Sequence, residues 1–325
     1  MKKRVVALLT VAAMLVSMIA VETVAFADEA EKDVPYVAVS LPPAENAWQA
    51  NFAEMIDKKM AEAQDEGVLT YSLKSSQDAA DQMNVIQTFK DDPELDFLVV
   101  LPVDGAQLTA TVEEVYDAGI PVIVCDRDIS SDKKTAFVAG DNYGCGVAAA
   151  EFIQDYFKDQ DEVKYVNLRS YAGTEIDLSR FNGFNDIISK DEKFVNLGEA
   201  DGEFNSTAGF EAMSNLLAAN DQIDFVYTHD DETTTGALTA IEQAGRDDIQ
   251  LITGMGGTVT ALREIAEGTG PHKMTAAYFP ADMAEIVIDA ILTYAETGEI
   301  ESELLFESYP ITKDNVEEFQ DKAYE

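Results

Sequence analysis

The stretch from Gly119 to Asp128 contains the arrangement of side chains best suited to binding a ligand. Four apolar residues, Val122 to Cys125, are followed directly by Asp126 and Arg127. A short apolar run bounded by a proline and by charges is typical of a buried strand in a parallel sheet. Open α/β sheets bind ligands at the carboxyl ends of such strands. A carboxylate beside a guanidinium could bind a polyhydroxylated ligand there, or the two could form an ion pair at the surface.

Residues that could bind a metal or a phosphate-containing cofactor, or form a disulfide, are scarce. The chain has two histidines, His229 and His272, and neither belongs to a spacing typical of a zinc site. The glycine-rich turn 254–258 lacks the spacing of a phosphate-binding loop. We therefore expect no metal and no cofactor. The cysteines, Cys125 and Cys145, are expected to be two buried thiols, although spacing alone does not decide whether they form a disulfide.

The net charge of this chain excludes several classes of partner. It is −40 over 325 residues. Nucleic acids and anionic membrane surfaces would be repelled, so neither is expected to bind. The carboxylates are spread along the whole sequence, which favours solvated faces over metal sites. The length is sufficient for two domains of ordinary size.

The N-terminal residues have the features of an export signal. Lys2, Lys3 and Arg4 precede a mostly apolar run, 5–21, and Ala25-Phe26-Ala27 offers small residues for cleavage. This pattern predicts a signal peptide over residues 1–27 and a mature protein that is secreted or periplasmic. An uncleaved membrane anchor is disfavoured by the short run and the cleavage site. The region has no cysteine that could accept a lipid.

From residue 34 onward, short apolar runs alternate with segments of helical period. This alternation predicts an α/β fold with two doubly wound parallel-sheet lobes. The predicted strands are 34–40, 68–73, 95–101, 122–125, 135–138, 163–168, 194–197, 225–228, 251–253, 274–278 and 304–309. The predicted helices are 48–63, 79–90, 106–118, 144–157, 177–189, 207–219, 233–244, 259–267 and 281–295.

Several short motifs occur in the order in which they are found in the periplasmic sugar-binding proteins of the ribose/galactose type. Each motif is weak alone, but their shared order is specific, and the resemblance covers residues 34–319. The motifs are Asn46-Ala47-Trp48, Leu101-Pro102-Val103-Asp104, Val124-Cys125-Asp126-Arg127, Ala139-Gly140-Asp141-Asn142, Ala172-Gly173-Thr174 with Arg180 and Gly183-Phe184, and Asp230-Asp231-Glu232 with Gly236-Ala237-Leu238.

The resemblance implies the type I periplasmic binding protein fold. Its N-terminal lobe would comprise residues 34–139 plus 280–306, and its C-terminal lobe residues 140–279 plus 307–325. Three crossovers, near Gly140, Phe279 and Tyr309, would join the lobes and act as a hinge. The ligand would lie in the cleft between the lobes.

The resemblance also implies a role for each predicted site residue. Asp126 and Arg127 would bind adjacent sugar hydroxyls, with Arg180 binding from the other lobe. Trp48 and Phe204 would stack on the apolar faces of the ring. The other predicted ligand residues are Asn46, Gln49, Asp177, Asp230, Gly256 and Tyr278. Three alternatives stay open, namely that Trp48 is a core residue, that Arg180 is a solvated helix residue, and that Asp177 has a surface role.

Three positions depart from the ribose-type pattern. Asp230 stands in place of an asparagine, Gly256 in place of an aspartate and Tyr278 in place of a glutamine. A buried polar group left without a partner costs about 1–3 kcal/mol, so these changes argue against ribose itself. The general sugar-binding chemistry is kept, and the specificity is open.

Three functions are compatible with these features. The first is a monomeric solute-binding protein that delivers a monosaccharide or polyol to the permease of an ABC importer. The second is a receptor for a sugar-like signal or for chemotaxis. The third is a secreted enzyme that uses Asp230 and Asp231 as acid and base, but two adjacent residues of one loop do not place carboxyls across a scissile bond. The signal peptide and the lack of a basic DNA-binding region in the sequence exclude a transcriptional regulator.

Overall fold

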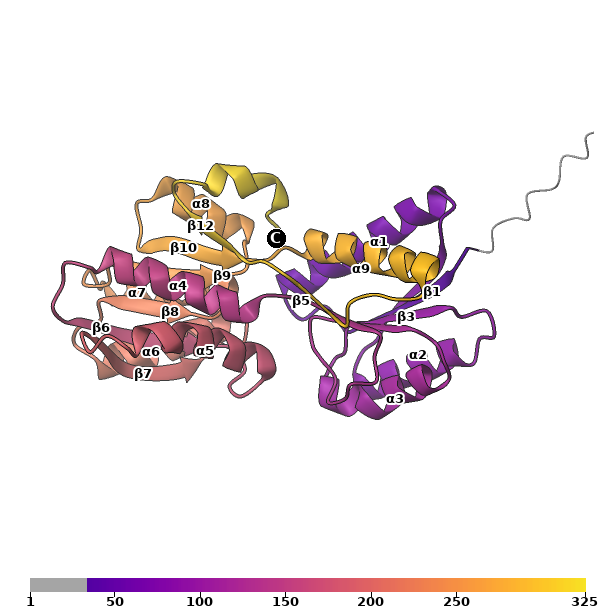
Figure 1. The fold of residues 1–325 in the computed structure, drawn as a ribbon. Coiled ribbons are helices and arrows are strands. Elements are labelled where there is room, and N and C mark those ends of the chain that lie inside the picture. The colour runs from indigo at the N-terminus through magenta and orange to yellow at the C-terminus, as the bar shows by residue number, and fades with distance from the viewer. Residues whose placement is uncertain (1–33) are drawn as a thin grey trace, which may run out of the picture. The chain divides into compact units, whose positions relative to one another are not determined.

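The computed structural model describes residues 34–325, and the predicted signal peptide lies outside the described residues. The described chain contains two six-stranded sheets (Figure 1). The first has the order β11-β5-β4-β3-β1-β2, and all its strand pairs are parallel. Its strands are β1 (Tyr36–Leu41), β2 (Thr70–Ser75), β3 (Phe97–Val100), β4 (Val122–Cys125), β5 (Ala136–Gly140) and β11 (Glu303–Phe306).

The second sheet has the order β12-β10-β9-β8-β6-β7. It is parallel except for its edge strand β12, which pairs antiparallel with β10. Its strands are β6 (Val163–Arg169), β7 (Phe194–Asp201), β8 (Phe225–Thr228), β9 (Leu251–Met255), β10 (His272–Ala277) and β12 (Tyr309–Thr312).

Helices cover both faces of the first sheet. The helices α1 (Ala47–Asp65) and α9 (Pro280–Thr297) share a core with Val37 and Val39 of β1. On the other face, α2 (Ala79–Lys90) and α3 (Gly105–Asp117) pack against Ala38. Because both faces of the central strands β3 and β4 are buried, their sequences are continuously apolar instead of alternating.

The second sheet is covered in the same way. One face packs against α4 (Asn142–Tyr156) and α5 (Glu175–Ile188), and the other against α6 (Ser206–Ala219) and α7 (Asp231–Ala244). The short helix α8 (Val259–Glu267) and the 3-10 helix η1 (Val316–Lys322) form a smaller core with β10 and β12. Both cysteines are free and buried in these cores, as expected.

The chain passes between the two sheets three times. It leaves the first sheet after Gly140, returns after Ala277, and leaves again between Phe306 and Tyr309. The prediction of one late strand over 304–309 is therefore wrong, because this stretch contains the end of β11 and the start of β12. The polar residues Glu307 and Ser308 separate the two strands, each of which pairs with a different sheet. Residues 34–325 nevertheless form one compact unit.

Several helices begin at a side chain that lies directly after a strand or its following loop. Asn46 caps α1 by accepting a hydrogen bond from the Gln49 N–H, and Asp230 caps α7 by accepting one from the Thr233 N–H. An N-cap oxygen satisfies a backbone donor that the helix itself leaves free. Capping therefore holds both side chains at the strand ends, where parallel sheets bind ligands.

Two glycines allow α4 and α5 to approach closely. A Cβ atom on Gly146 would lie 2.2 Å from the carbonyl oxygen of Arg180, and one on Gly183 would lie 2.1 Å from that of Tyr143. Arg180 and Gly183 lie three residues apart, on the same face of α5. The close contact thus fixes the helix segment that carries Arg180.

Among residues 34–325, no helix combines the length and the apolar content that crossing a membrane requires.

Gly183→Ala should destabilise the protein by about 1–3 kcal/mol, because the added methyl group collides with backbone atoms that cannot move aside. The free energy of unfolding from urea denaturation measures this effect. Gly270→Ala is the matched control, since a Cβ there meets nothing within 4 Å. Equal stabilities of the two variants would contradict the proposed close packing of α4 and α5.

Candidate functional site

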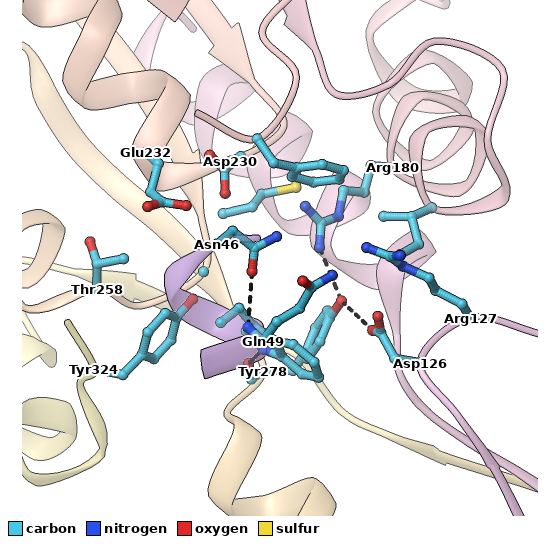
Figure 2. Close-up of a pocket in the computed structure, with 15 residues that line it drawn as sticks. Asn46, Gln49, Asp126, Arg127, Arg180, Asp230, Glu232, Thr258, Tyr278 and Tyr324 are labelled. Carbon is cyan, nitrogen blue, oxygen red and sulfur yellow. Dashed lines mark hydrogen bonds between the residues drawn. The ribbon is translucent and has the colours of Figure 1, made fainter. Parts of the chain in front are cut away.

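A cavity lies at the carboxyl ends of strands from both sheets (Figure 2). It encloses about 500 Å³ of empty space, counting the part that is open to solvent. Every predicted ligand residue except Asp177 lines it. The lining residues are Asn46, Trp48, Gln49, Asp126, Arg127, Ile176, Arg180, Phe204, Asp230, Glu232, Met255, Gly256, Thr258, Tyr278 and Tyr324.

Asp126 and Arg127 face the cavity from the end of β4. Asp126 adopts a φ of 59°, a left-handed conformation that is uncommon outside glycine and that turns the chain sharply at the strand end. Its carboxylate is buried, and burial raises its pKa, while Arg127 and Arg180 oppose this rise. Arg127 donates a hydrogen bond to the Val103 carbonyl over 2.7 Å. The structure thus places the acid and the guanidinium at the cavity.

Arg180 approaches the cavity from α5, which packs on the second sheet, and it is only 6% exposed. The alternative that it is a solvated helix residue is therefore wrong. Its guanidinium donates hydrogen bonds to Asn142 Oδ1 over 2.9 Å, to the Tyr278 hydroxyl over 3.1 Å and to the His229 carbonyl. The ring of Phe204 lies 5.7 Å from the guanidinium carbon. These partners fix the charge in one orientation toward the cavity.

Tyr278 and Trp48 join the two sides of the site. The Tyr278 hydroxyl lies 3.5 Å from Asp126 Oδ1, and the Trp48 indole donates to the Tyr278 carbonyl over 3.3 Å. Trp48 also stacks on Phe52, with ring centroids 5.6 Å apart and an interplanar angle of 13°. Trp48 packs against the core and also lines the cavity, and its stacking on a ligand stays a prediction.

Asn46 and Gln49 line the cavity at the start of α1. The Asn46 Oδ1 is used by the helix cap, which leaves its amide N–H groups as donors to a ligand. The Gln49 Oε1 accepts a hydrogen bond from the Glu45 backbone over 2.9 Å, so its amide nitrogen can likewise donate. The capping bond and the short helical turn hold both side chains in position.

Asp230 and Glu232 form an acidic end of the cavity. Burial by the surrounding walls raises the pKa of Asp230 to about 7, and the neighbouring carboxylates of Glu232 and Asp231 add to the rise. The Thr233 backbone N–H and the charge of Arg180 oppose it. Burial also raises the pKa of Glu232. The substitution of aspartate for asparagine at position 230 therefore introduces a group that titrates near neutral pH.

The space beside Gly256 is filled by other side chains. Gly256 has a φ of 148°, and a Cβ on it would lie 2.8 Å from the Tyr324 hydroxyl and 3.1 Å from Asp231 Oδ2. Asp231 itself is buried and accepts hydrogen bonds from Gly257, Thr258 and Thr275. The aspartate missing at position 256 would thus collide with a tyrosine from the C-terminal segment.

Asp177 lies away from the cavity wall and is fully buried. It accepts hydrogen bonds from the Arg169 guanidinium, over 3.0 Å at Nε, and from the Gly173 N–H over 2.9 Å. Burial raises its pKa, but His229, Arg169 and Gly173 together hold the pKa well below its usual value. The alternative of a surface role is wrong, because a buried ion pair occupies this carboxylate.

Sequence reasoning did not select five of the lining residues, namely Ile176, Glu232, Met255, Thr258 and Tyr324. Glu232 and Met255 belong to motifs that were recognised, and Thr258 ends the glycine-rich turn. Their positions beside predicted ligand residues could therefore have indicated that they line the site. Tyr324 lies beyond the segment that resembles the family. Its contact with the site depends on a bridge between Thr258 and Tyr324, which no local pattern indicates.

Comparison with known protein sequences identifies a family match over most of the chain. A profile of the periplasmic binding protein domain matches residues 37–300. The chain is 28% identical over 270 residues to a ribose import binding protein of Bacillus subtilis, an alignment that covers 82% of this chain and 85% of that protein.

Solved structures show the same fold. A galactofuranose-binding protein superposes with a TM-score of 0.78 at 23% identity, covering 89% of this chain and 98% of the other. An ABC transporter solute-binding protein of Bacillus halodurans with bound myo-inositol also has a TM-score of 0.78, at 24% identity and the same coverage. At this level of identity the likeness concerns the fold, which confirms the predicted fold class.

Asp230→Asn should make the stability less dependent on pH. A carboxyl group whose pKa is higher in the folded than in the unfolded chain retains its proton on folding, so stability falls as pH rises from its unfolded to its folded pKa. For Asp230 this window runs from the usual aspartate pKa of 3.8 to a pKa of about 7. Asparagine keeps the helix cap. As pH rises through this window, the variant should therefore gain about 4 kcal/mol of stability relative to wild type.

Urea unfolding of both proteins across this pH window tests the prediction. Asp289→Asn, which removes an exposed carboxylate from α9, is the control and should leave the pH dependence unchanged. A parallel pH profile for wild type and Asp230→Asn would show that Asp230 ionises normally in the folded protein.

Proposed function

The chain belongs to the periplasmic binding protein domain family, and from this premise we propose that it binds a monosaccharide or related polyol in the described cavity. It would then deliver this ligand to the membrane permease of an ABC importer. The observation that carries the proposal is that Asp126 and Arg127, which follow β4 of the first sheet, and Arg180, which lies on α5 beside the second sheet, converge on one cavity. Neighbouring hydroxyl groups of a sugar match such a set of rigid donors and acceptors.

The aromatic residues of the cavity support the same ligand class. Trp48, Phe204, Tyr278 and Tyr324 line it. Flat apolar rings cover the C–H faces of a sugar while losing little rotamer entropy. The relatives are named for ribose and galactofuranose, and a solved neighbour contains myo-inositol, which are all neutral polyhydroxylated compounds.

We also propose that the two sheets with their helices are separate lobes with the bounds predicted from the sequence, 34–139 plus 280–306 and 140–279 plus 307–325. The three passages of the chain between the sheets would then be the hinge. Tyr278 lies at one passage and packs on Gly140 at another, where a Cβ would lie 2.1 Å from its ring. A change in hinge angle would therefore act directly on the wall of the cavity.

The site supports binding without turnover. The two carboxylates that the enzyme alternative requires, Asp230 and Asp231, are not both available, because Asp231 is occupied by hydrogen bonds from two backbone amides and a threonine. The predicted signal peptide and the family support a location in the periplasm or outside the cell. We also propose that the mature protein acts as a monomer.

Thermal unfolding of the mature protein with a panel of pentoses, hexoses, cyclitols and amino sugars tests the binding function. A ligand at a hundred times its dissociation constant should stabilise the protein by about 2.7 kcal/mol. Arg127→Ala should weaken this ligand at least tenfold, about 1.4 kcal/mol, because a charged donor is lost from the cavity. Lys190→Ala, which removes an exposed cation outside the cavity, is the control. A panel without any stabilising compound would contradict sugar binding.

A further inference from the structure

Charged side chains are segregated within the cavity. Figure 2 shows Asp230 and Glu232 near Asn46 and Thr258 at one end, whereas Arg127 and Asp126 lie at the other, with Arg180 between Asp230 and Arg127. Asp230 and Glu232 are close enough that the charge of Glu232 raises the pKa of Asp230. A ligand that fills the cavity therefore meets two carboxylates on one side and the Arg127–Asp126 pair on the other.

The acidic end has no cationic partner of its own. None of the ion pairs formed within residues 34–325 includes Asp230 or Glu232. Arg263 lines a neighbouring cavity together with Glu232, but it also forms none of these pairs. Two partly buried carboxylates without a counter-charge are unfavourable unless a ligand supplies one or they bind protons.

Arg180 does not neutralise this end. Its three nitrogens donate to Asn142, to Tyr278 and to the His229 carbonyl, and its hydrogen bonds include none to Asp230 or Glu232. Its charge lowers the pKa of Asp230, but burial and the two neighbouring carboxylates outweigh this effect. The pair also faces the backbone N–H groups of Thr233 and Ala47, the Asp231 carboxylate and the Tyr324 hydroxyl.

We propose that the ligand is a sugar or cyclitol that carries a protonated amine, and that its ammonium group binds between Asp230 and Glu232. The inference rests on the proposed function and narrows its ligand class. The hydroxyl groups would bind Arg127, Asp126 and Arg180 at the other end of the cavity. An ammonium group has three donors and no acceptor, which matches two acceptor-only carboxylates.

The departures from the ribose-type pattern agree with this inference. An asparagine at position 230 would offer both a donor and an acceptor to a hydroxyl group, whereas an ionised aspartate only accepts and adds a negative charge. Tyr324, which occupies the space beside Gly256, reduces the room for a hydroxyl-binding acid there. A metal ion is a poorer occupant, because no group of three or more potential metal ligands exists among residues 34–325.

Titration calorimetry with matched compounds tests the proposal. The probes are D-glucosamine, D-galactosamine, D-mannosamine and an inosamine, each compared with its neutral hydroxyl parent, and each hexosamine also with its uncharged N-acetyl form. At least one amine should bind ten times more tightly than its parent. Below the pKa of Asp230, binding of the amine should also release a proton, which is detected as a dependence of the heat on the ionisation enthalpy of the buffer.

Variants of Asp230 and Glu232 test whether these two residues cause the preference for an amine over its neutral parent. Asp230→Asn and Glu232→Gln should each reduce the ratio of amine to parent affinity at least tenfold. Asp230→Asn keeps the cap of α7, and thermal unfolding without ligand verifies that both variants fold. Glu242→Gln removes an exposed carboxylate of the same helix outside the cavity and should leave the ratio unchanged.

Two results would overturn the inference, and they differ in what they imply for the proposed function. If a neutral parent binds at least as tightly as every amine, the acidic pair accepts hydrogen bonds from hydroxyls, and sugar binding stands. If neither the amines nor any neutral sugar or cyclitol binds, both the inference and the proposed function fail.

Discussion

The burial of the Arg180 guanidinium is the constraint on which the site depends. A buried charge is tolerated only if hydrogen bonds replace its hydration. Asn142, Tyr278 and the His229 carbonyl supply them, and they belong to α4, to the segment after β10 and to the end of β8. One side chain thereby ties together three separate parts of the chain. The glycine contacts between α4 and α5 bring Arg180 close enough for this arrangement.

The polar residues of the cavity are held before any ligand arrives. Asn46 and Asp230 are fixed by the helices they cap, Arg127 by the Val103 carbonyl, and Asp126 by the left-handed turn after β4. Ordering these groups in advance lowers the entropy that is lost when a ligand binds. The same rigidity keeps the carboxyl groups of Asp230 and Glu232 together at one end of the cavity, and this proximity contributes to the raised pKa of Asp230.

Much of the fold and part of the site follow from local sequence patterns. The alternation of apolar runs and helical segments predicts the element types, because the spacing of apolar residues within a short segment distinguishes a helix from a strand. The position of Asp126 and Arg127 after a buried strand likewise predicts that they face a ligand. By contrast, the split between β11 and β12 depends on which sheet each strand joins. The place of Tyr324 and the burial of Asp177 depend on partners that are distant in the sequence, namely Thr258 for Tyr324 and His229 for Asp177.

The most direct test of this account is a crystal structure of the mature protein with a compound that stabilises it in solution. The account predicts that the ligand occupies the cavity with hydroxyl oxygens within hydrogen-bond distance of Arg127 and Arg180, while Arg180 keeps its bonds to Asn142 and Tyr278. A ligand bound elsewhere, or one inside the cavity that contacts neither guanidinium, would contradict the central role of these two arginines.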